Sequence, residues 1–397
     1  LPPRISRRQL TTKEKFQSLF RVTASSLALF TGINIYTGNE KFYEKVLMPA
    51  VRLIDPEKAH KIAIIATKYG LVSPRVYQDP VTLKTTVWGI NFTNPLGMAA
   101  GFDKHGEAVS GLHKMGFGFV EVGSVTPIPQ EGNPKPRVFR LNEDNAVINR
   151  YGFNSDGHEV VYERLQGVKN SGDFTGIIGV NLGKNKTASD HVQDYLDGVK
   201  KFGEIANYFV INISSPNTPG LRALQHKEKL EELILKINEA SEGSPNKPPL
   251  LVKLAPDLSD QERQDIADII NSSKCKIDGL VISNTTIDRS NLKSLEKNEI
   301  GGLSGAPLTN LSTAMIGDMY RRTHGKIPII GVGGIFSGAD AYEKIKAGAC
   351  LVQIYTSYVY HGPPIVNRIK KELNELLLKD GYSSVGDAVG AAVKHKS

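Results

Sequence analysis

The chain has 397 residues, of which 40% are hydrophobic and 23% are charged, so its composition is that of a globular protein and excludes wholesale disorder. The formal net charge of +8 is concentrated in residues 1–21, which hold six Lys and Arg against one acid and leave only +3 for the rest. A nucleic-acid-binding domain would spread its basic residues over one folded face, so we expect no nucleic acid partner. Cys275 and Cys350 lack metal-ligand spacing, which argues against a disulfide framework and against a metal site.

The N-terminal segment, predicted as residues 1–38, combines a basic arm with an apolar run. Arg, Ser and Thr with almost no acid are typical of the remnant of a mitochondrial presequence. The apolar run at residues 22–36 is a candidate membrane anchor. Its fifteen residues are fewer than the roughly twenty that span a bilayer, and polar residues dilute it. The sequence therefore leaves open whether residues 18–36 span a membrane or rest on its surface.

Residues 39–75 are predicted to form a small domain of two amphipathic helices. Residues 40–54 carry apolar side chains at helical spacing, and Asp55-Pro56 supplies an N-cap and a first-turn proline for a second helix that reaches Tyr69. Such a pair packs on the main domain as a flap, forms a partner surface, or inserts shallowly into a membrane. The sequence alone slightly favours the flap.

Residues 76–397 are predicted to form one barrel domain, because β-rich apolar runs alternate with helical patterns from Pro80 onward. Eight such repeats over about 300 residues favour a (β/α)8 TIM barrel over an open doubly wound sheet. A hairpin at 82–87 and 90–92 should close the bottom, and a ribbon at 138–141 and 146–149 should lie over the top. The predicted strands are Leu96–Ala100, Phe119–Gly123, Ile177–Asn181, Phe209–Ile213, Leu250–Leu254, Gly279–Ser283, Pro328–Val332 and Leu351–Tyr355.

The predicted strand exits are where ligands meet such a barrel. Small, amide or basic groups follow all eight strands, which is hard to explain by turn formation alone. At the seventh exit, Gly331-Val-Gly-Gly334 precedes Ser337-Gly-Ala-Asp340, which is read as a capping-box start to a helix. Backbone N–H groups and a helix dipole there favour an anion, and with Tyr355-Thr356 they predict a phosphate site. The spacing is not the dinucleotide fingerprint, so a mononucleotide phosphate is the better hypothesis.

Four asparagines are predicted around the same mouth, namely Asn149, Asn212, Asn217 and Asn284. Amides offer donors and acceptors together, which suits a flat heterocycle with alternating C=O and N–H edges. Taken alone, the segment around Ser215 is better explained by amides that cap turns and a hydroxyl that bonds to backbone, and the repetition of polar groups at the other strand exits reverses that preference. The strand ends supply only Asp103 and Glu121 as acids, which argues against glycosidase or two-metal chemistry. Lys104 and Lys253 would stabilise a developing anion, or one of them would form a Schiff base.

Six motifs, four of them at these exits, resemble class 2 dihydroorotate dehydrogenases, and the resemblance extends from about Phe42 to Gly381. The basic arm and the two helices ahead of the barrel are similar to the membrane-associated mitochondrial form. The motifs are Ala99-Ala-Gly-Phe-Asp-Lys-His-Gly-Glu107, Asn149-Arg-Tyr-Gly-Phe-Asn154, Asn181-Leu-Gly-Lys-Asn185, Asn212-Ile-Ser-Ser-Pro-Asn-Thr218, Ser283-Asn-Thr-Thr286 and Gly302-Leu-Ser-Gly305.

The resemblance implies oxidation of (S)-dihydroorotate to orotate by tightly bound FMN, with electrons passed to ubiquinone, as the fourth step of pyrimidine biosynthesis. It also implies a monomer at the mitochondrial inner membrane. Ser215 matches the residue that takes the C5 proton while hydride leaves C6, a position at which class 1 enzymes have Cys. Because serine is a poor base unless its surroundings accept the proton, Thr218 with a water is a plausible relay.

The remaining roles are carried over position by position. The implied substrate ligands are Lys104, Asn149, Asn212, Asn217, Asn284 and Thr285. The implied FMN-binding residues are Ala99, Ala100, Gly101, Ser124, Asn149, Asn181, Asn212, Lys253, Ser304, Gly305, Gly334, Tyr355 and Thr356. The implied quinone tunnel, entered between the two N-terminal helices, has His60, Phe102, Arg140 and Tyr355. For two of these a structural role is equally plausible, because His60 could satisfy a helix carbonyl and Arg140 could pair with a surface acid.

Three other functions are weighed against this one. A tRNA dihydrouridine synthase would need a basic RNA-binding face and a cysteine acid, against which Ser215 and the modest barrel charge argue. A phosphate-binding aldolase would use Lys253 as a Schiff base. If the chain were a non-catalytic membrane-interaction protein, the polar groups at the eight strand exits would have no function.

Overall fold

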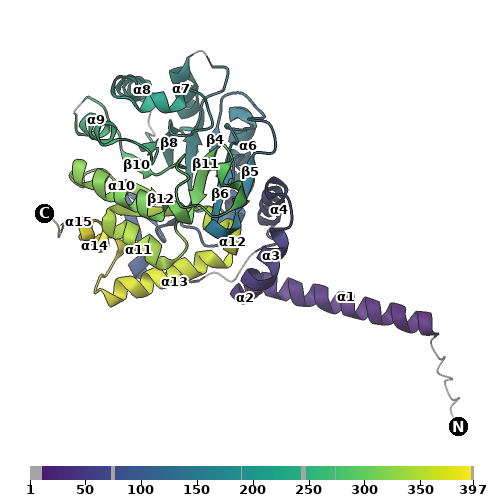
Figure 1. Cartoon of the computed structure of the whole chain (residues 1–397). Helices are drawn as coiled ribbons and strands as arrows, with labels where there is room; N and C mark the ends of the chain where they lie inside the picture. The colour runs from purple at the N-terminus through teal and green to yellow at the C-terminus, as the bar shows by residue number, and fades with distance from the viewer. Residues whose placement is uncertain (1–10, 73–76, 189, 243–246, 273, 395–397) are drawn as a thin grey trace, which may run out of the picture.

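The barrel is the centre of the computed structural model, which describes residues 11–72, 77–188, 190–242, 247–272 and 274–394 (Figure 1). Eight parallel strands close in the order β10-β12-β13-β3-β4-β7-β8-β9, which confirms the predicted TIM barrel. Strand ends differ from the predicted ones by two residues or fewer. The strands are β3 (Leu96–Met98), β4 (Phe119–Val125), β7 (Ile177–Leu182), β8 (Tyr208–Asn212), β9 (Leu250–Leu254), β10 (Gly279–Ile282), β12 (Ile329–Val332) and β13 (Ala349–Ile354).

Helices cover the outside of the barrel, and every residue of β7, β8, β9, β10 and β12 is buried. Burial on both faces explains why these strands read as continuous apolar runs in the sequence. The surrounding helices are α5 (Val109–Lys114), α6 (Gly157–Asn170), α7 (His191–Phe202), α8 (Lys227–Ala240), α9 (Asp260–Asn271), α10 (Thr309–Arg322), α11 (Gly338–Ala347), α12 (Thr356–His361), α13 (Pro364–Lys379), α14 (Val385–Ala388) and α15 (Ala391–Lys394).

The bottom of the barrel is closed by the hairpin of β1 (Thr85–Val87) and β2 (Ile90–Phe92), as predicted. Val87 and Phe92 belong to the apolar cluster that fills the barrel interior. The Trp88 indole N–H donates to the carbonyl of Asp278 at 2.7 Å, which ties the hairpin to the start of β10. With one end closed by side chains, a ligand can enter only at the opposite end.

The ribbon over the top has three strands rather than the predicted two. β5 (Val138–Leu141) pairs with β6 (Ala146–Asn149), and β6 pairs on its other side with β11 (Gly302–Gly305). The sequence of β11, Gly-Leu-Ser-Gly, has little β propensity, so hydrophobic patterning could not reveal it. The third strand carries Ser304 and Gly305 to the barrel mouth.

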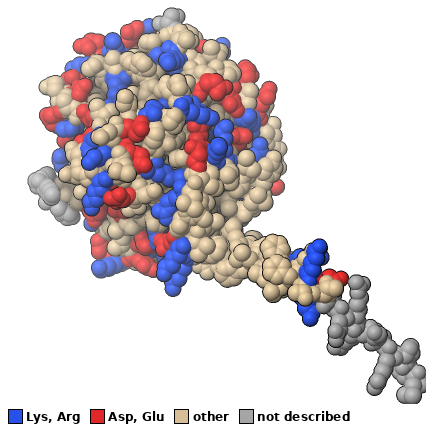
Figure 2. All heavy atoms as spheres, turned by 45° about the vertical axis from the view of Figure 1, so that its right-hand side comes forward, with Lys and Arg blue, Asp and Glu red and all other residues tan. Residues whose placement is uncertain are grey.

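The N-terminal helix α1 (Thr12–Thr37) projects from the body of the protein (Figures 1 and 2). Thr11 and Glu14 form its capping box, so the helix starts ten residues before the apolar run. The helix is thus longer than the fifteen-residue apolar run: its 26 residues extend over about 39 Å, against about 30 Å for a hydrocarbon core. Within the described chain, α1 is the one helix long and apolar enough to cross a membrane. Arg4, Arg7 and Arg8 of the predicted arm lie outside the described residues.

The predicted two-helix segment follows α1 and packs against the barrel. Its first helix is composite, with α2 (Glu40–Phe42), a π-helical turn η1 (Tyr43–Leu47) and α3 (Met48–Val51) in succession. The second, α4 (Pro56–Lys68), begins at the predicted Asp55 N-cap. The contacts to the barrel include Glu57 on α4, which accepts from buried Arg137 at 2.9 Å.

The same segment leaves apolar side chains uncovered. Leu53 is 90% exposed, and other uncovered residues are Val46, Ile62, Ile65 and Tyr69. The segment thus has a barrel-facing side and an apolar outer side. The division of the chain at residues 38 and 75 stays a prediction.

Candidate active site

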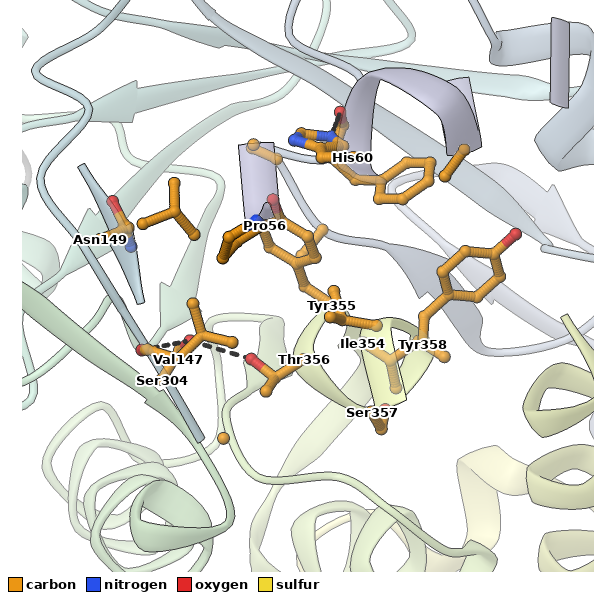
Figure 3. Close-up of a pocket in the computed structure, with 18 of the residues that line it drawn as sticks. Pro56, His60, Val147, Asn149, Ser304, Ile354, Tyr355, Thr356, Ser357 and Tyr358 are labelled. Carbon is orange, nitrogen blue, oxygen red and sulfur yellow. Dashed lines mark hydrogen bonds between the residues drawn. The ribbon is translucent and has the colours of Figure 1, made fainter. Parts of the chain in front are cut away.

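One cavity of about 400 Å³ joins the barrel mouth to the two-helix segment. Its inner part is lined by strand exits and its outer part by α3 and α4, with Pro56 and His60 facing Tyr355 (Figure 3). All predicted site residues line this cavity except Asn181 and Thr218. Both exceptions are buried beside it, and Asn181 accepts hydrogen bonds from two lining residues, Ser124 and Asn212.

The amides at the mouth form a connected network. The Asn284 amide donates to Asn212 Oδ1 at 3.2 Å and to Ser214 Oγ at 2.9 Å, and the Asn212 amide donates to Ser124 Oγ at 2.8 Å. From the ribbon side, Asn149 Oδ1 accepts from the Asn217 amide at 3.3 Å. These bonds fix which face of each amide is presented to the cavity. Capping of turns therefore accounts for only part of the role of these amides.

Two hydroxyls follow β8. Ser215 Oγ accepts from the Asn217 backbone N–H at 3.3 Å, and among the described residues its own proton has no acceptor. Thr218 is 6% exposed, and its hydroxyl has no partner in the described part of the chain. A buried hydroxyl without a partner is uncommon and suits a bound water or ligand.

Two lysines bring positive charge to the cavity. Lys104 donates to the Gly101 carbonyl at 2.7 Å and lies 4.1 Å from the centre of the Tyr151 ring. Burial, together with the nearby Arg137 cation, lowers the pKa of Lys104 to about 7. Lys253 on β9 is 6% exposed, and its ammonium has no hydrogen-bond partner among the described residues. Burial lowers the pKa of Lys253, an effect that the Glu121 charge opposes.

Glu121 is a positioning residue that the sequence singled out only as an acid. It is fully buried inside the barrel, where one carboxylate oxygen accepts from the Asn181 amide at 2.8 Å. The other accepts from Gln353 at 2.7 Å and from the Tyr208 hydroxyl at 3.3 Å. An acid within an otherwise apolar strand was the available sequence signal. Its contacts hold Asn181, and through Asn181 the amide of Asn212.

The glycine turn after β12 can be formed only without a side chain. Gly334 has φ 69°, and a Cβ there would lie 2.2 Å from Thr309 Oγ1, which donates to the Gly334 carbonyl at 2.7 Å. Ser337 caps α11 as predicted, but the N–H group that bonds to Asp340 belongs to Phe336 and not to the cap residue. Opposite the turn, Thr356 Oγ1 donates to Ser304 Oγ at 2.9 Å (Figure 3).

The outer part of the cavity holds the predicted tunnel residues. His60 Nε2 lies 2.7 Å from the Phe102 carbonyl, so the residue does satisfy a carbonyl, although one of the barrel and not of its own helix. Arg140 donates to the carbonyls of Arg52 and Ile54 at 3.0 and 2.8 Å, and not to a surface acid. Burial lowers the pKa of His60 to about 4, so the imidazole is neutral at pH 7.

The neutral imidazole of His60 predicts that the stability of the folded chain depends on pH. Because the unfolded chain protonates His60 near its ordinary pKa and the folded chain only near 4, the unfolded state binds more protons between these values and stability falls with falling pH. His60→Gln keeps a donor for Phe102 but cannot titrate. We expect urea unfolding to show that the variant loses about 2 kcal/mol less stability than the parent between pH 7 and pH 5. Equal losses in both proteins would contradict a buried neutral imidazole.

The closed fold and the polar mouth together define a (β/α)8-barrel enzyme. The family model described as dihydroorotate dehydrogenase matches residues 82–377. The mitochondrial dihydroorotate dehydrogenase (quinone) of Mus musculus is 53% identical over 370 residues, which cover 91% of this chain and 93% of the relative. The same enzyme of Arabidopsis thaliana is 48% identical over 399 residues, which cover 92% of this chain and 86% of the relative.

A solved structure agrees with these relatives. The dihydroorotate dehydrogenase of Eimeria tenella in complex with ferulenol superimposes with a TM-score of 0.82 at 43% identity, covering 86% of this chain and 96% of the other. The chain therefore belongs to the dihydroorotate dehydrogenase family, and within it to the quinone-dependent class 2.

Proposed function

We propose that this chain, a quinone-dependent dihydroorotate dehydrogenase of pyrimidine biosynthesis, oxidises (S)-dihydroorotate at the barrel mouth with tightly bound FMN and delivers the electrons to ubiquinone. The observation that carries the proposal is the single cavity that connects a polar mouth to an apolar helix pair. Such a cavity can bring a polar pyrimidine and an apolar quinone to one redox cofactor without passing through water.

The chemistry of the cavity fits FMN. An unpartnered buried ammonium at Lys253 calls for an anionic or acceptor-rich ligand, and the Gly334 turn beside Thr356 offers backbone N–H groups for a phosphate. FMN bound here would supply the two-electron redox chemistry that links dihydroorotate to the quinone. The residues proposed to hold it are Ala99, Ala100, Gly101, Ser124, Asn149, Asn181, Asn212, Lys253, Ser304, Gly305, Gly334, Tyr355 and Thr356.

The substrate residues surround the same mouth. We assign recognition of the pyrimidine ring and its carboxylate to the amides of Asn149, Asn212, Asn217 and Asn284 with Thr285, and we propose that Lys104 lies between the flavin and the substrate. Ser215 Oγ takes the C5 proton, and Thr218 passes it on through a water. Because these polar groups are buried, an analogue that lacks their partners leaves them unsatisfied and is rejected.

The quinone residues are proposed in the outer cavity. Arg140 has donors beyond those used on the carbonyls of Arg52 and Ile54, and we assign one of them to a quinone carbonyl. His60, Phe102 and Tyr355 line the way inward. The uncovered apolar residues of the two-helix segment, with the exposed helix α1, fit attachment to a membrane, and the name of the mouse relative describes that enzyme as mitochondrial. We propose that this chain is a monomer at the mitochondrial inner membrane.

One assay tests this function against its rivals. The purified protein should be yellow, should lose its flavin colour when dihydroorotate is added without oxygen, and should regain the colour with a ubiquinone analogue. NAD or fumarate should not restore it. A colourless protein that borohydride and a carbonyl substrate label at Lys253 would instead support an aldolase.

A further inference from the structure

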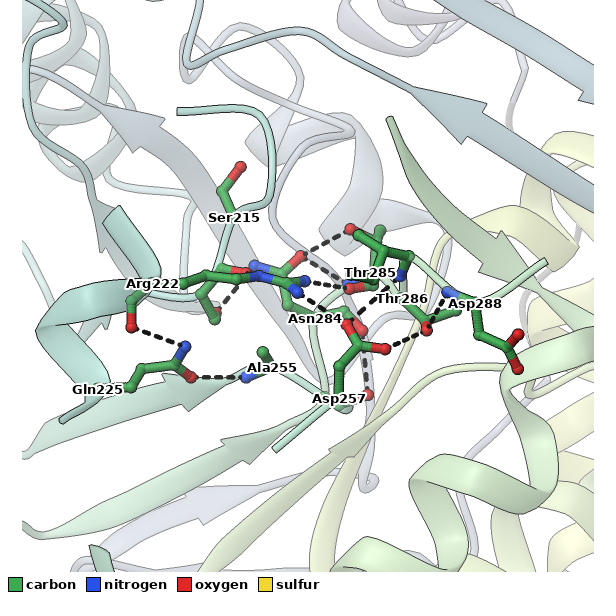
Figure 4. Close-up of polar contacts among 12 residues, drawn as sticks. Ser215, Arg222, Gln225, Ala255, Asp257, Asn284, Thr285, Thr286 and Asp288 are labelled. Atoms are coloured by element: carbon green, nitrogen blue, oxygen red, sulfur yellow. Dashed lines mark hydrogen bonds and ion pairs between the residues drawn. The ribbon is translucent and has the colours of Figure 1, made fainter. Parts of the chain in front are cut away.

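A polar cluster beside the barrel mouth is built around residues that have no role assigned above (Figure 4). Its centre is Arg222, in the turn that follows β8. Arg222 donates from Nε to the Ser214 carbonyl at 3.0 Å, from Nη1 to the Asp257 carboxylate at 2.8 Å, and from Nη2 to the Thr285 carbonyl at 3.0 Å. All three guanidinium nitrogens are engaged, and each contacts the exit of a different strand, namely β8, β9 and β10.

The partners of Arg222 are themselves held in place. Asp257 Oδ1 accepts from the Thr286 hydroxyl, and its Oδ2 accepts from the Ile287 N–H at 3.3 Å. Gln225 donates to the Arg222 carbonyl at 3.4 Å and accepts from the Ala255 N–H at 2.9 Å. The cluster thus joins three neighbouring strand exits into one unit.

Both backbone carbonyls that accept hydrogen bonds from the Arg222 side chain lie next to proposed catalytic and substrate-binding groups. The Ser214 carbonyl is part of the peptide bond that leads into Ser215, and the Thr285 carbonyl follows Asn284 by one residue. Neither Arg222 nor Asp257 lines the cavity. An effect of either residue on the reaction must therefore pass through the backbone that it holds.

We infer that Arg222, oriented by Asp257, is a positioning residue that fixes the Ser215 hydroxyl relative to the ring-binding residues Asn284 and Thr285. This inference rests on the proposed function. A small displacement of a general base from its proton is costly, since proton transfer requires hydrogen-bond reach. Lysine cannot replace arginine here, because an ammonium on a flexible chain does not present a planar fork to three acceptors in fixed directions.

The test compares lysine substitutions at two arginines that lie in similar surroundings. Arg222→Lys keeps the charge but removes the three-way contact. Its control, Arg263→Lys, affects the pair Arg263–Asp318, whose side chains are 25% and 19% exposed, against 24% and 20% for Arg222 and Asp257. We expect flavin reduction by dihydroorotate to slow about 10-fold or more in Arg222→Lys and to stay unchanged in the control. Reoxidation by a ubiquinone analogue and FMN content should be unchanged in both.

A double variant separates positioning from general support of the fold. In a Ser215→Ala background the group through which Arg222 acts is gone, so Arg222→Lys should slow reduction by less than about 2-fold further. Hydrogen exchange of the backbone N–H groups of Ser215 and Asn217 should be faster in Arg222→Lys than in the parent.

The outcomes distinguish this inference from the function on which it rests. The inference would be overturned if the flavin of Arg222→Lys were reduced at the parent rate. It would also be overturned if Arg222→Lys slowed flavin reduction in the Ser215→Ala background by the same factor as in the parent. If dihydroorotate fails to reduce the parent protein, the proposed function itself fails.

Discussion

Ser215→Ala should retain FMN and slow anaerobic flavin reduction by dihydroorotate about 10²-fold or more. The expected size is that of general-base catalysis, which contributes roughly 10²–10⁴-fold. The Ser215 hydroxyl accepts one backbone N–H and is otherwise available to a ligand in the cavity. Stopped-flow measurement of flavin absorbance after mixing with excess dihydroorotate isolates this step from reoxidation.

The matched control is Ser294→Ala. Ser294 is 3% exposed, close to the 7% of Ser215, but it lies outside the cavity. Loss of a buried hydroxyl alone should leave the rate unchanged. A Ser215→Ala variant that is reduced as fast as the parent would remove Ser215 from the role of base and assign the proton to another group.

The barrel and its mouth were predictable from sequence because both follow from local rules. Continuous apolar strands, alternating with helical periods, specify a parallel sheet, and the residues after each strand must gather at one end. That is why Asn212 and Asn284, which are 72 residues apart, were expected together and are in direct contact. Local turn chemistry likewise identified the cap at Ser337.

What the sequence could not reveal depends on contacts between distant or weakly patterned residues. Strand β11 has no β-forming residues of its own and exists because β6 pairs with it. The start of α1 lies among charged residues, where an apolar run gives no signal, although its capping box was available. The contacts of Arg222 join residues up to 63 positions apart, and nothing in an isolated arginine indicates which carbonyls it will meet.

Lys253→Met is the second substitution for which we expect a large effect. Methionine has a similar length and no charge, so it removes the ammonium while filling its space. Preorganised charge at a site of developing negative charge is worth about 10²–10³ in rate, and we expect flavin reduction to slow by that factor. The flavin midpoint potential should also become more negative, because a nearby cation favours the state that carries the additional electrons.

Lys184→Met tests whether any buried lysine would give the same result. Lys184 is 3% exposed against 6% for Lys253, and burial lowers the pKa of both, but Lys184 lies outside the cavity. Its substitution should leave the potential and the rate as they are. Because Lys253 has Glu121 as its opposing charge, removing the lysine also leaves that acid uncompensated, which strengthens the negative shift. A Lys253→Met variant with the parent potential would mean that the ammonium does not face the flavin.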